Sequence, residues 1–166
     1  MSTKTVTAIY DDLRTANHAI SMLKTNGFSD GELSILAADG SFDKNIKIEE
    51  NTKAPEGTSA GAVVGGAVGA TLAGLTAVGT VTLTGGTGLV AAGPIVAALA
   101  GGGAGAATGG VIGGLIGMGM PETEAKLIDE RLGTGNVMLG VTIESEQRDL
   151  TKALLDKSGA HNITVH

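Results

Sequence analysis

One uncharged segment constrains this chain more than any other feature. From Gly57 to Pro121 the sequence contains no Asp, Glu, Lys, Arg or His, and it holds most of the chain's 28 glycines. Small residues recur there at every fourth position, which places them along one stripe of an α-helix where a second backbone can approach closely. This glycine zipper predicts tight helix–helix packing. The predicted helix-packing residues are Gly57, Gly61, Gly65, Gly69, Gly101, Gly105, Gly109, Gly113 and Gly117.

The uncharged segment predicts a long Gly/Ala-rich helical hairpin, with helices over 58–78 and 94–118 and a turn within 79–93. Each helix would have about 20 residues, enough to cross a hydrocarbon core of about 30 Å. Residues 101–110 contain nothing larger than threonine, and no Trp or Tyr belt flanks the segment. We therefore expect most of the hairpin surface to face other helices, with apolar patches left for lipid. A soluble low-complexity linker is the alternative.

The first charged arm predicts a β-α-β unit. A strand over 5–10 precedes a helix that Asp11 or Asp12 caps and that Gly27 ends, and a second strand covers 32–37. The apolar face of the helix consists of Leu13, Ala16, Ile20 and Leu23.

The second charged arm repeats this pattern. A strand over 137–143 precedes a helix that Ser145 caps and that ends near Lys157, and a short strand covers 162–165. The predicted apolar face of that helix consists of Leu150, Ala153 and Leu154, and its predicted stop is Gly159. An additional helix is expected from Pro121 to Gly133, with Leu127, Ile128 and Leu132 as its apolar edge.

Two such units predict an α+β fold, a ferredoxin-like split βαβ sandwich with two helices on one face of a four-stranded antiparallel sheet, interrupted by the hairpin. The expected organisation is a first half of the head at 1–56, the glycine-zipper hairpin at 57–120 and the second half of the head at 121–166.

Composition excludes several classes of function. The net charge of −6 and the three aromatic residues argue against nucleic-acid binding, which needs a basic surface and stacking platforms. The absence of Cys excludes disulfide and thiolate chemistry. Because the first residues lack the apolar core of a signal peptide, we expect both charged arms in the cytoplasm.

No motif predicts catalysis, a cofactor, a metal or a small-molecule substrate. Residues 39–50 have the acidic spacing of a Ca²⁺ loop, but Lys44 replaces the required glycine. Residues 86–91 resemble a dinucleotide fingerprint without the acidic ribose partner. His18, His161 and His166 lack ligand spacing, and no nucleophile has an adjacent base. The chain is therefore expected not to be an enzyme.

The order of the parts resembles that of bacterial general stress and low-temperature-induced proteins. The resemblance lies in Tyr10-Asp11-Asp12 after the first strand, in 27–35, in the Gly/Ala insert and above all in the junction at 117–125, GMGMPETEA. It covers nearly the whole chain and implies a stress-linked, non-enzymatic protein with a membrane-like insert. The second predicted helix is richer in glycine than is usual in that family.

The sequence thus predicts a structural protein that self-assembles as a homo-oligomer and associates with a lipid membrane through the hairpin, both termini being cytoplasmic. A cytoplasmic large assembly is the alternative location. Two functional alternatives stay open: an oligomeric channel or pore, and a ferredoxin-like module that senses a small molecule.

Overall fold

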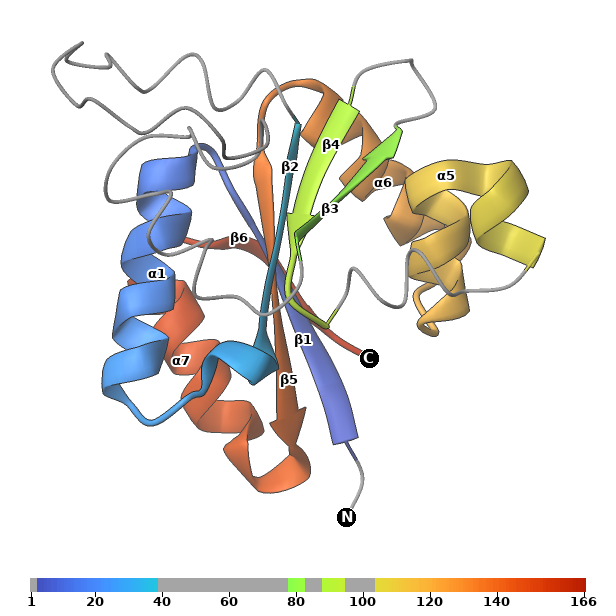
Figure 1. The fold of residues 1–166 in the computed structure, drawn as a ribbon. Helices are drawn as coiled ribbons and strands as arrows, with labels where there is room; N and C mark the ends of the chain where they lie inside the picture. The colour runs from blue at the N-terminus through green and yellow to red at the C-terminus, as the bar shows by residue number, and fades with distance from the viewer. Residues whose placement is uncertain (1–2, 39–77, 83–87, 95–103) are drawn as a thin grey trace, which may run out of the picture.

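The computed structural model describes residues 3–38, 78–82, 88–94 and 104–166. Within these residues one antiparallel sheet of six strands lies between two layers of helices (Figure 1). The strands are β1 (Thr3–Tyr10), β2 (Leu33–Ala38), β3 (Val78–Thr82), β4 (Gly88–Ala92), β5 (Val137–Glu144) and β6 (His161–Val165). The helices are α1 (Leu13–Thr25), α5 (Ala104–Gly117), α6 (Glu122–Gly133) and α7 (Arg148–Lys157), with 3₁₀ turns at Asp30–Glu32 and Ser145–Gln147. The predicted α+β class is confirmed.

The strands lie in the order β3-β4-β2-β5-β1-β6, and every neighbouring pair is antiparallel. The neighbouring strands β1 and β5 come from opposite ends of the chain. Thr3 of β1 pairs with Glu144 of β5, and Tyr10 pairs with Val137. The two charged arms therefore form one sheet, as the sequence predicts.

One core lies between the sheet and the layer formed by α1 and α7. Alternate residues of β1, β2 and β5 point into this core. This alternation confirms that these segments are strands with one apolar face toward the helices. The strands contribute Val6, Ala8, Tyr10, Leu33, Ile35, Ala37, Val137, Leu139, Val141 and Ile143. The predicted apolar face of α1 is also confirmed, because Leu13, Ala16, Ile20 and Leu23 are all buried.

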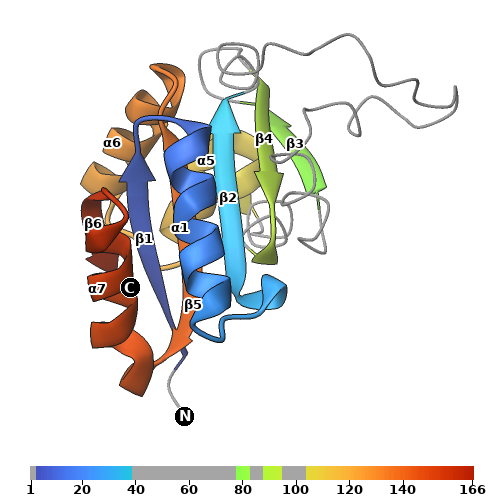
Figure 2. The same cartoon turned by 90° about the vertical axis from the view of Figure 1, so that its left-hand side faces the viewer.

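A second core covers the opposite face of the sheet, where the sequence analysis placed no helix. In Figure 2, α1 lies in front of the sheet and α5 behind it. The second core consists of Ile9, Leu36, Ala38, Ala91, Val111, Leu115, Met120, Ala125, Ile128, Leu132 and Met138. All six residues of β2 are buried as a result. The expectation that helices cover only one face is wrong.

The long helical hairpin is not confirmed. Residues 58–77 and 95–103 lie outside the described part of the chain. Val78, expected to end the first helix, begins β3, and the segment expected to be a turn contains two paired strands, β3 and β4. The second helix is described from Ala104 to Gly117, and Gly110 interrupts it with a non-helical conformation (φ 54°, ψ −137°).

Gly93, which extends the four-residue period at its start, has a role that the pattern did not predict. It follows β4 with φ +94°, a conformation that favours glycine. A Cβ atom there would lie 2.1 Å from the carbonyl oxygen of Leu33 and 2.7 Å from Cα of Ser34. Gly93 therefore allows the end of β4 to pass directly against the start of β2.

The register of the last helix also differs from the prediction. The turn Ser145–Gln147, which has Glu144 as its N-cap, precedes α7, and the N-cap of α7 itself is Gln147 rather than Ser145. The buried residues of α7 are Thr151 and Leu155, whereas Leu150 is 48% exposed. Leu154 packs partly buried against the first core as predicted, but the face is centred on Leu155, and the predicted Leu150 and Ala153 are exposed.

The boundaries of the other helices agree closely with the sequence analysis. Asp12 is the N-cap of α1, and Gly27 and Gly159 end α1 and α7 with positive φ values. Pro121 is the N-cap of α6 rather than its first residue, and Glu122 begins the helix. Within the predicted apolar edge of α6, Ile128 and Leu132 are buried, but Leu127 is 39% exposed.

Candidate functional site

The helix-packing glycines that the structure describes lie in α5. Gly105 and Gly109 precede the interruption at Gly110, and Gly113 and Gly117 follow it. A single straight stripe does not run through all four, because helical geometry stops at Gly110. The other five predicted glycines, Gly57, Gly61, Gly65, Gly69 and Gly101, lie outside the described residues.

After Gly110, α5 has one face toward the head and another away from it. Val111, Gly114 and Leu115 are buried, and Val111 and Leu115 belong to the second core. At roughly 100° per residue, Gly113 and Gly117 lie roughly 150° and 115° around the helix from the centre of that buried stripe. Gly113 is half-buried, Gly117 is exposed and Ile116 is 41% exposed. We call Gly113, Ile116 and Gly117 the outward face of α5.

The outward face of α5 has the chemistry of a helix-packing surface. Its glycines are not used to pack α5 against its own head, because Val111 and Leu115 make that contact. Glycines on the free side of a helix allow another backbone to approach, and the adjacent Ile116 offers apolar area for burial. No charged residue occurs in α5 to oppose such a contact.

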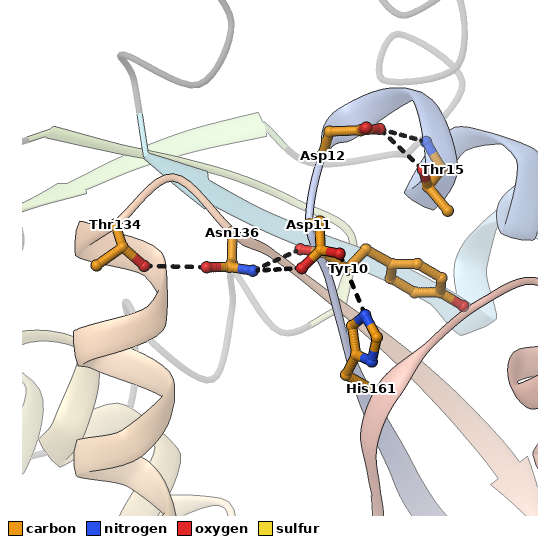
Figure 3. Close-up of polar contacts among 7 residues, drawn as sticks. All are labelled: Tyr10, Asp11, Asp12, Thr15, Thr134, Asn136 and His161. Carbon is orange, nitrogen blue, oxygen red and sulfur yellow. Dashed lines mark hydrogen bonds and ion pairs between the residues drawn. The ribbon is translucent and has the colours of Figure 1, made fainter.

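A second group of interest is the polar cluster at the end of β1, drawn in Figure 3. Asn136 donates hydrogen bonds from Nδ2 to the carbonyl oxygen of Tyr10 (3.3 Å) and to Oδ1 of Asp11 (3.2 Å). Thr134 Oγ1 donates to Asn136 Oδ1 (2.9 Å), and His161 Nε2 lies 3.2 Å from Oδ2 of Asp11. The cluster connects the ends of β1 and α6 to the start of β6.

The ion pair of the polar cluster lies near the surface, and the cluster links the ends of three elements. The side chains of Asp11 and His161 are 72% and 53% exposed, and an ion pair so close to water contributes little. Asp12 points away from the cluster in Figure 3 and accepts bonds from the backbone N–H (2.7 Å) and the hydroxyl (2.9 Å) of Thr15. The backbone bond from Thr15 is the main reason that the pKa of Asp12 is lowered. Its predicted role as a helix cap is confirmed.

A hollow of about 390 Å³ lies between α6 and β6 and is open to solvent. It is lined by Thr123, Glu124, Leu127, Asn162 and Thr164. Beside it, the largely buried side chain of His166 places Nε2 at 3.4 Å from Oε1 of Glu124 and at 3.5 Å from Oγ1 of Thr7.

The contact between His166 and Glu124 was not predicted. In the sequence the two residues belong to separate elements, and only the register of β6 against β1 brings them together. The neighbouring Thr7 gives the one sequence signal: it is the polar residue within 6–10, the part of β1 that is buried on both faces.

The structure describes the other sequence candidates only in part. The acidic loop at 39–50 lies outside the described residues. The described part of the dinucleotide-like segment lies in β4, antiparallel to β3, whereas a dinucleotide site needs a strand followed by a helix. Across residues 3–38, 78–82, 88–94 and 104–166, no three His, Cys, Asp or Glu side chains are grouped as a metal site would require. None of the helices in the same ranges is both long and apolar enough to cross a bilayer.

No family model, curated protein or solved structure matches this chain.

Proposed function

We propose that this chain is a non-enzymatic structural protein that self-assembles and associates with membrane through its uncharged segment, residues 57–120. The observation that carries the proposal is the outward face of α5. That face presents Gly113 and Gly117 away from the core that the described residues form, on a side that is available for packing against another molecule or lipid. A link to stress rests on the sequence resemblance alone.

We also propose that the head is a ferredoxin-like split βαβ sandwich. Four of its strands lie in the order β2-β5-β1-β6, with all neighbours antiparallel, and this order supports the assignment. Helices α1 and α7 pack together on one face, as that fold requires. In this proposal β3, β4, α5 and α6 are additions that extend the sheet and cover its second face.

The assembly is tested with two glycine-to-leucine variants. Gly117→Leu adds four carbons to the outward face of α5, and overpacking a tight helix contact costs about 1–3 kcal/mol per site, or roughly tenfold in affinity. Gly133→Leu is the matched control, because no atom lies within 4 Å of a Cβ built at Gly133. A Val111→Leu variant would not serve as a control, because Val111 is fully buried and a larger side chain there would disturb the second core.

Light scattering during gel filtration is expected to show oligomers for the wild type and Gly133→Leu, and smaller species for Gly117→Leu. If both variants assemble equally well, the outward face of α5 is not a contact between copies. A wild type that stays monomeric at every concentration would overturn self-assembly itself.

Membrane association needs a separate test that leaves the head intact. Deleting the whole predicted hairpin would remove β3, β4 and α5, so the deletion should cover only residues 58–77. Full-length protein is expected to float with lipid vesicles and to stay in carbonate-washed membranes, and the deletion variant is expected to lose both properties. Large soluble particles that never float would favour burial between copies, and a soluble monomer would overturn the proposal.

The hollow between α6 and β6 favours one second candidate, a module that senses a small molecule. Its wall combines hydroxyl, amide and carboxylate groups with the side chain of Leu127, a mixture that suits a small polar ligand. Screening metabolites by thermal shift tests this candidate, with Leu127→Trp as a variant that fills the hollow. A stabilisation that Leu127→Trp does not reduce would count against this site.

A further inference from the structure

The two edges of the sheet differ in how well they are protected from pairing with another strand. β6 forms one edge and β3 the other. Edge strands expose unpaired N–H and C=O groups, and proteins usually protect them with charge, proline, bulges or distortion. The comparison between the edges therefore shows where another strand can add.

The β6 edge carries such protection. Its pairing with β1 changes register between Thr7 and Ile9, and Asn162 has a positive φ of 49°. His161 at the start of the strand is held against Asp11. These irregularities twist a short strand and discourage continued pairing.

The β3 edge has none of these features. Val78–Thr82 contains no charge and no proline, and it pairs with β4 through five consecutive residue pairs without a register shift. Within the described residues, β4 is the only strand that pairs with it. The edge is regular and uncharged, which is the combination that promotes strand addition.

We propose that β3 pairs antiparallel with β3 of a second copy, so that two sheets join into one. This proposal rests on the proposed self-assembly and names one of its contacts. A two-fold interface brings a surface against itself, and an uncharged strand can meet its own copy without like-charge repulsion. Four of the five residues of β3 are β-branched (Val78, Thr80, Val81 and Thr82), and β-branched residues favour strand pairing, so a second β3 is a well-suited occupant of the edge.

The pairing also gives α5 a place in the interface. α5 packs next to β3 on the second face of the sheet (Figure 1). A two-fold axis normal to the joined sheet places the same face of both copies on the same side of that sheet. The two α5 helices then lie on the same face, on either side of the β3–β3 junction.

Symmetry makes the proposal sharply testable. The chain has no Cys, so single cysteines can be placed at each of positions 78–82 without a background. In a two-fold antiparallel pair, one residue lies directly opposite the same residue of the other copy. For each residue further from that position, the two copies of a residue move apart by about 6.6 Å along the strands, since each strand advances by about 3.3 Å. Because a disulfide needs Cα atoms within about 7 Å, only one of the five positions should cross-link efficiently. We expect at least about tenfold more dimer at that position than two residues away.

Thr164→Cys in β6 and Gly133→Cys on α6 are the controls for random collision, and thermal unfolding by circular dichroism confirms that each variant is folded. Oligomers without a position-specific cross-link in 78–82 would overturn β3 pairing and leave self-assembly standing. Monomers without any cross-link would overturn both. Monomers that are protected from labelling at 78–82 would show that another part of the same chain covers the edge.

Discussion

Tyr10 and Ser158 share a hydrogen bond of 2.7 Å between Oη and Oγ, inside the core formed by α1 and α7. It links the last residue of β1 to the C-cap of α7, so it fixes two ends that are far apart in sequence. Ser158 Oγ also donates to the carbonyl oxygen of Leu155 (2.7 Å). The Tyr10 hydroxyl therefore donates the hydrogen bond, and Ser158 Oγ accepts it.

The first prediction concerns ionisation of Tyr10, which is the only Tyr in the chain. Burial raises its pKa to about 12. The ultraviolet absorbance of the phenolate should stay flat from about pH 9 to about pH 11, where an unfolded chain ionises with a pKa of about 10. Because the folded pKa is the higher one, stability is retained below about pH 10 and falls as pH rises toward 12. Normal titration near pH 10 in folded protein would contradict this prediction.

The second prediction concerns Gly93. Gly93→Ala should destabilise the protein by about 2–4 kcal/mol, because it adds a positive-φ penalty to a clash with the backbone of β2. Gly133→Ala is the control and should be close to neutral, since the added methyl group meets nothing within 4 Å. Denaturant unfolding measures both variants. A neutral Gly93→Ala variant would mean that β4 does not pass so close to β2.

The third prediction tests the register of α7. Leu155→Ala should cost about 2–5 kcal/mol, because Leu155 is fully buried in the first core. Leu150→Ala should change stability by less than about 0.5 kcal/mol, because Leu150 is half exposed. Chemical denaturation measures the free energy of unfolding of both variants. A larger loss for Leu150→Ala than for Leu155→Ala would support the register expected from sequence.

The fourth prediction uses the adjacent acidic residues at the start of α1. Asp12→Ala removes the N-cap and should cost about 1 kcal/mol, whereas Asp11→Ala breaks only exposed contacts and should cost less. Because the pKa of Asp12 is lowered in the fold, its contribution is present near neutral pH and is lost as pH falls through the folded pKa. Thermal unfolding at several acidic pH values should show the difference between the two variants shrinking.

Local patterns predicted much of the head. The alternation of apolar and polar residues correctly located β1, β2 and β5. Asp12 as the cap and Gly27 as the stop placed the two ends of α1 within about two residues of their observed positions. These signals depend only on neighbouring residues. The register of α7 was wrong because Leu150, Leu154 and Leu155 make two overlapping stripes, and only tertiary packing selects the one with Leu155.

The second core was missed although the sequence carries a signal for it. Leu36, Met138 and Ile9 are apolar at positions between those that face the first core, and such continuous apolar runs are typical of strands covered on both sides. The uncharged segment misled the prediction for a different reason. Gly and Ala suit a helix–helix contact and a close approach of two strands equally well. At Gly93 the close approach is between the end of β4 and the start of β2.

The pairing of β1 with β5 has a consequence for synthesis on the ribosome. Thr3–Tyr10 emerges first, but its partner Val137–Glu144 is made only after the whole uncharged segment has been synthesised. Closing so large a loop is entropically costly and slow. For that interval the nascent chain exposes an unpaired strand together with its most apolar stretch. If residues 57–120 contact lipid or neighbouring copies as proposed, those contacts have time to form before the head closes, and assembly can begin during translation.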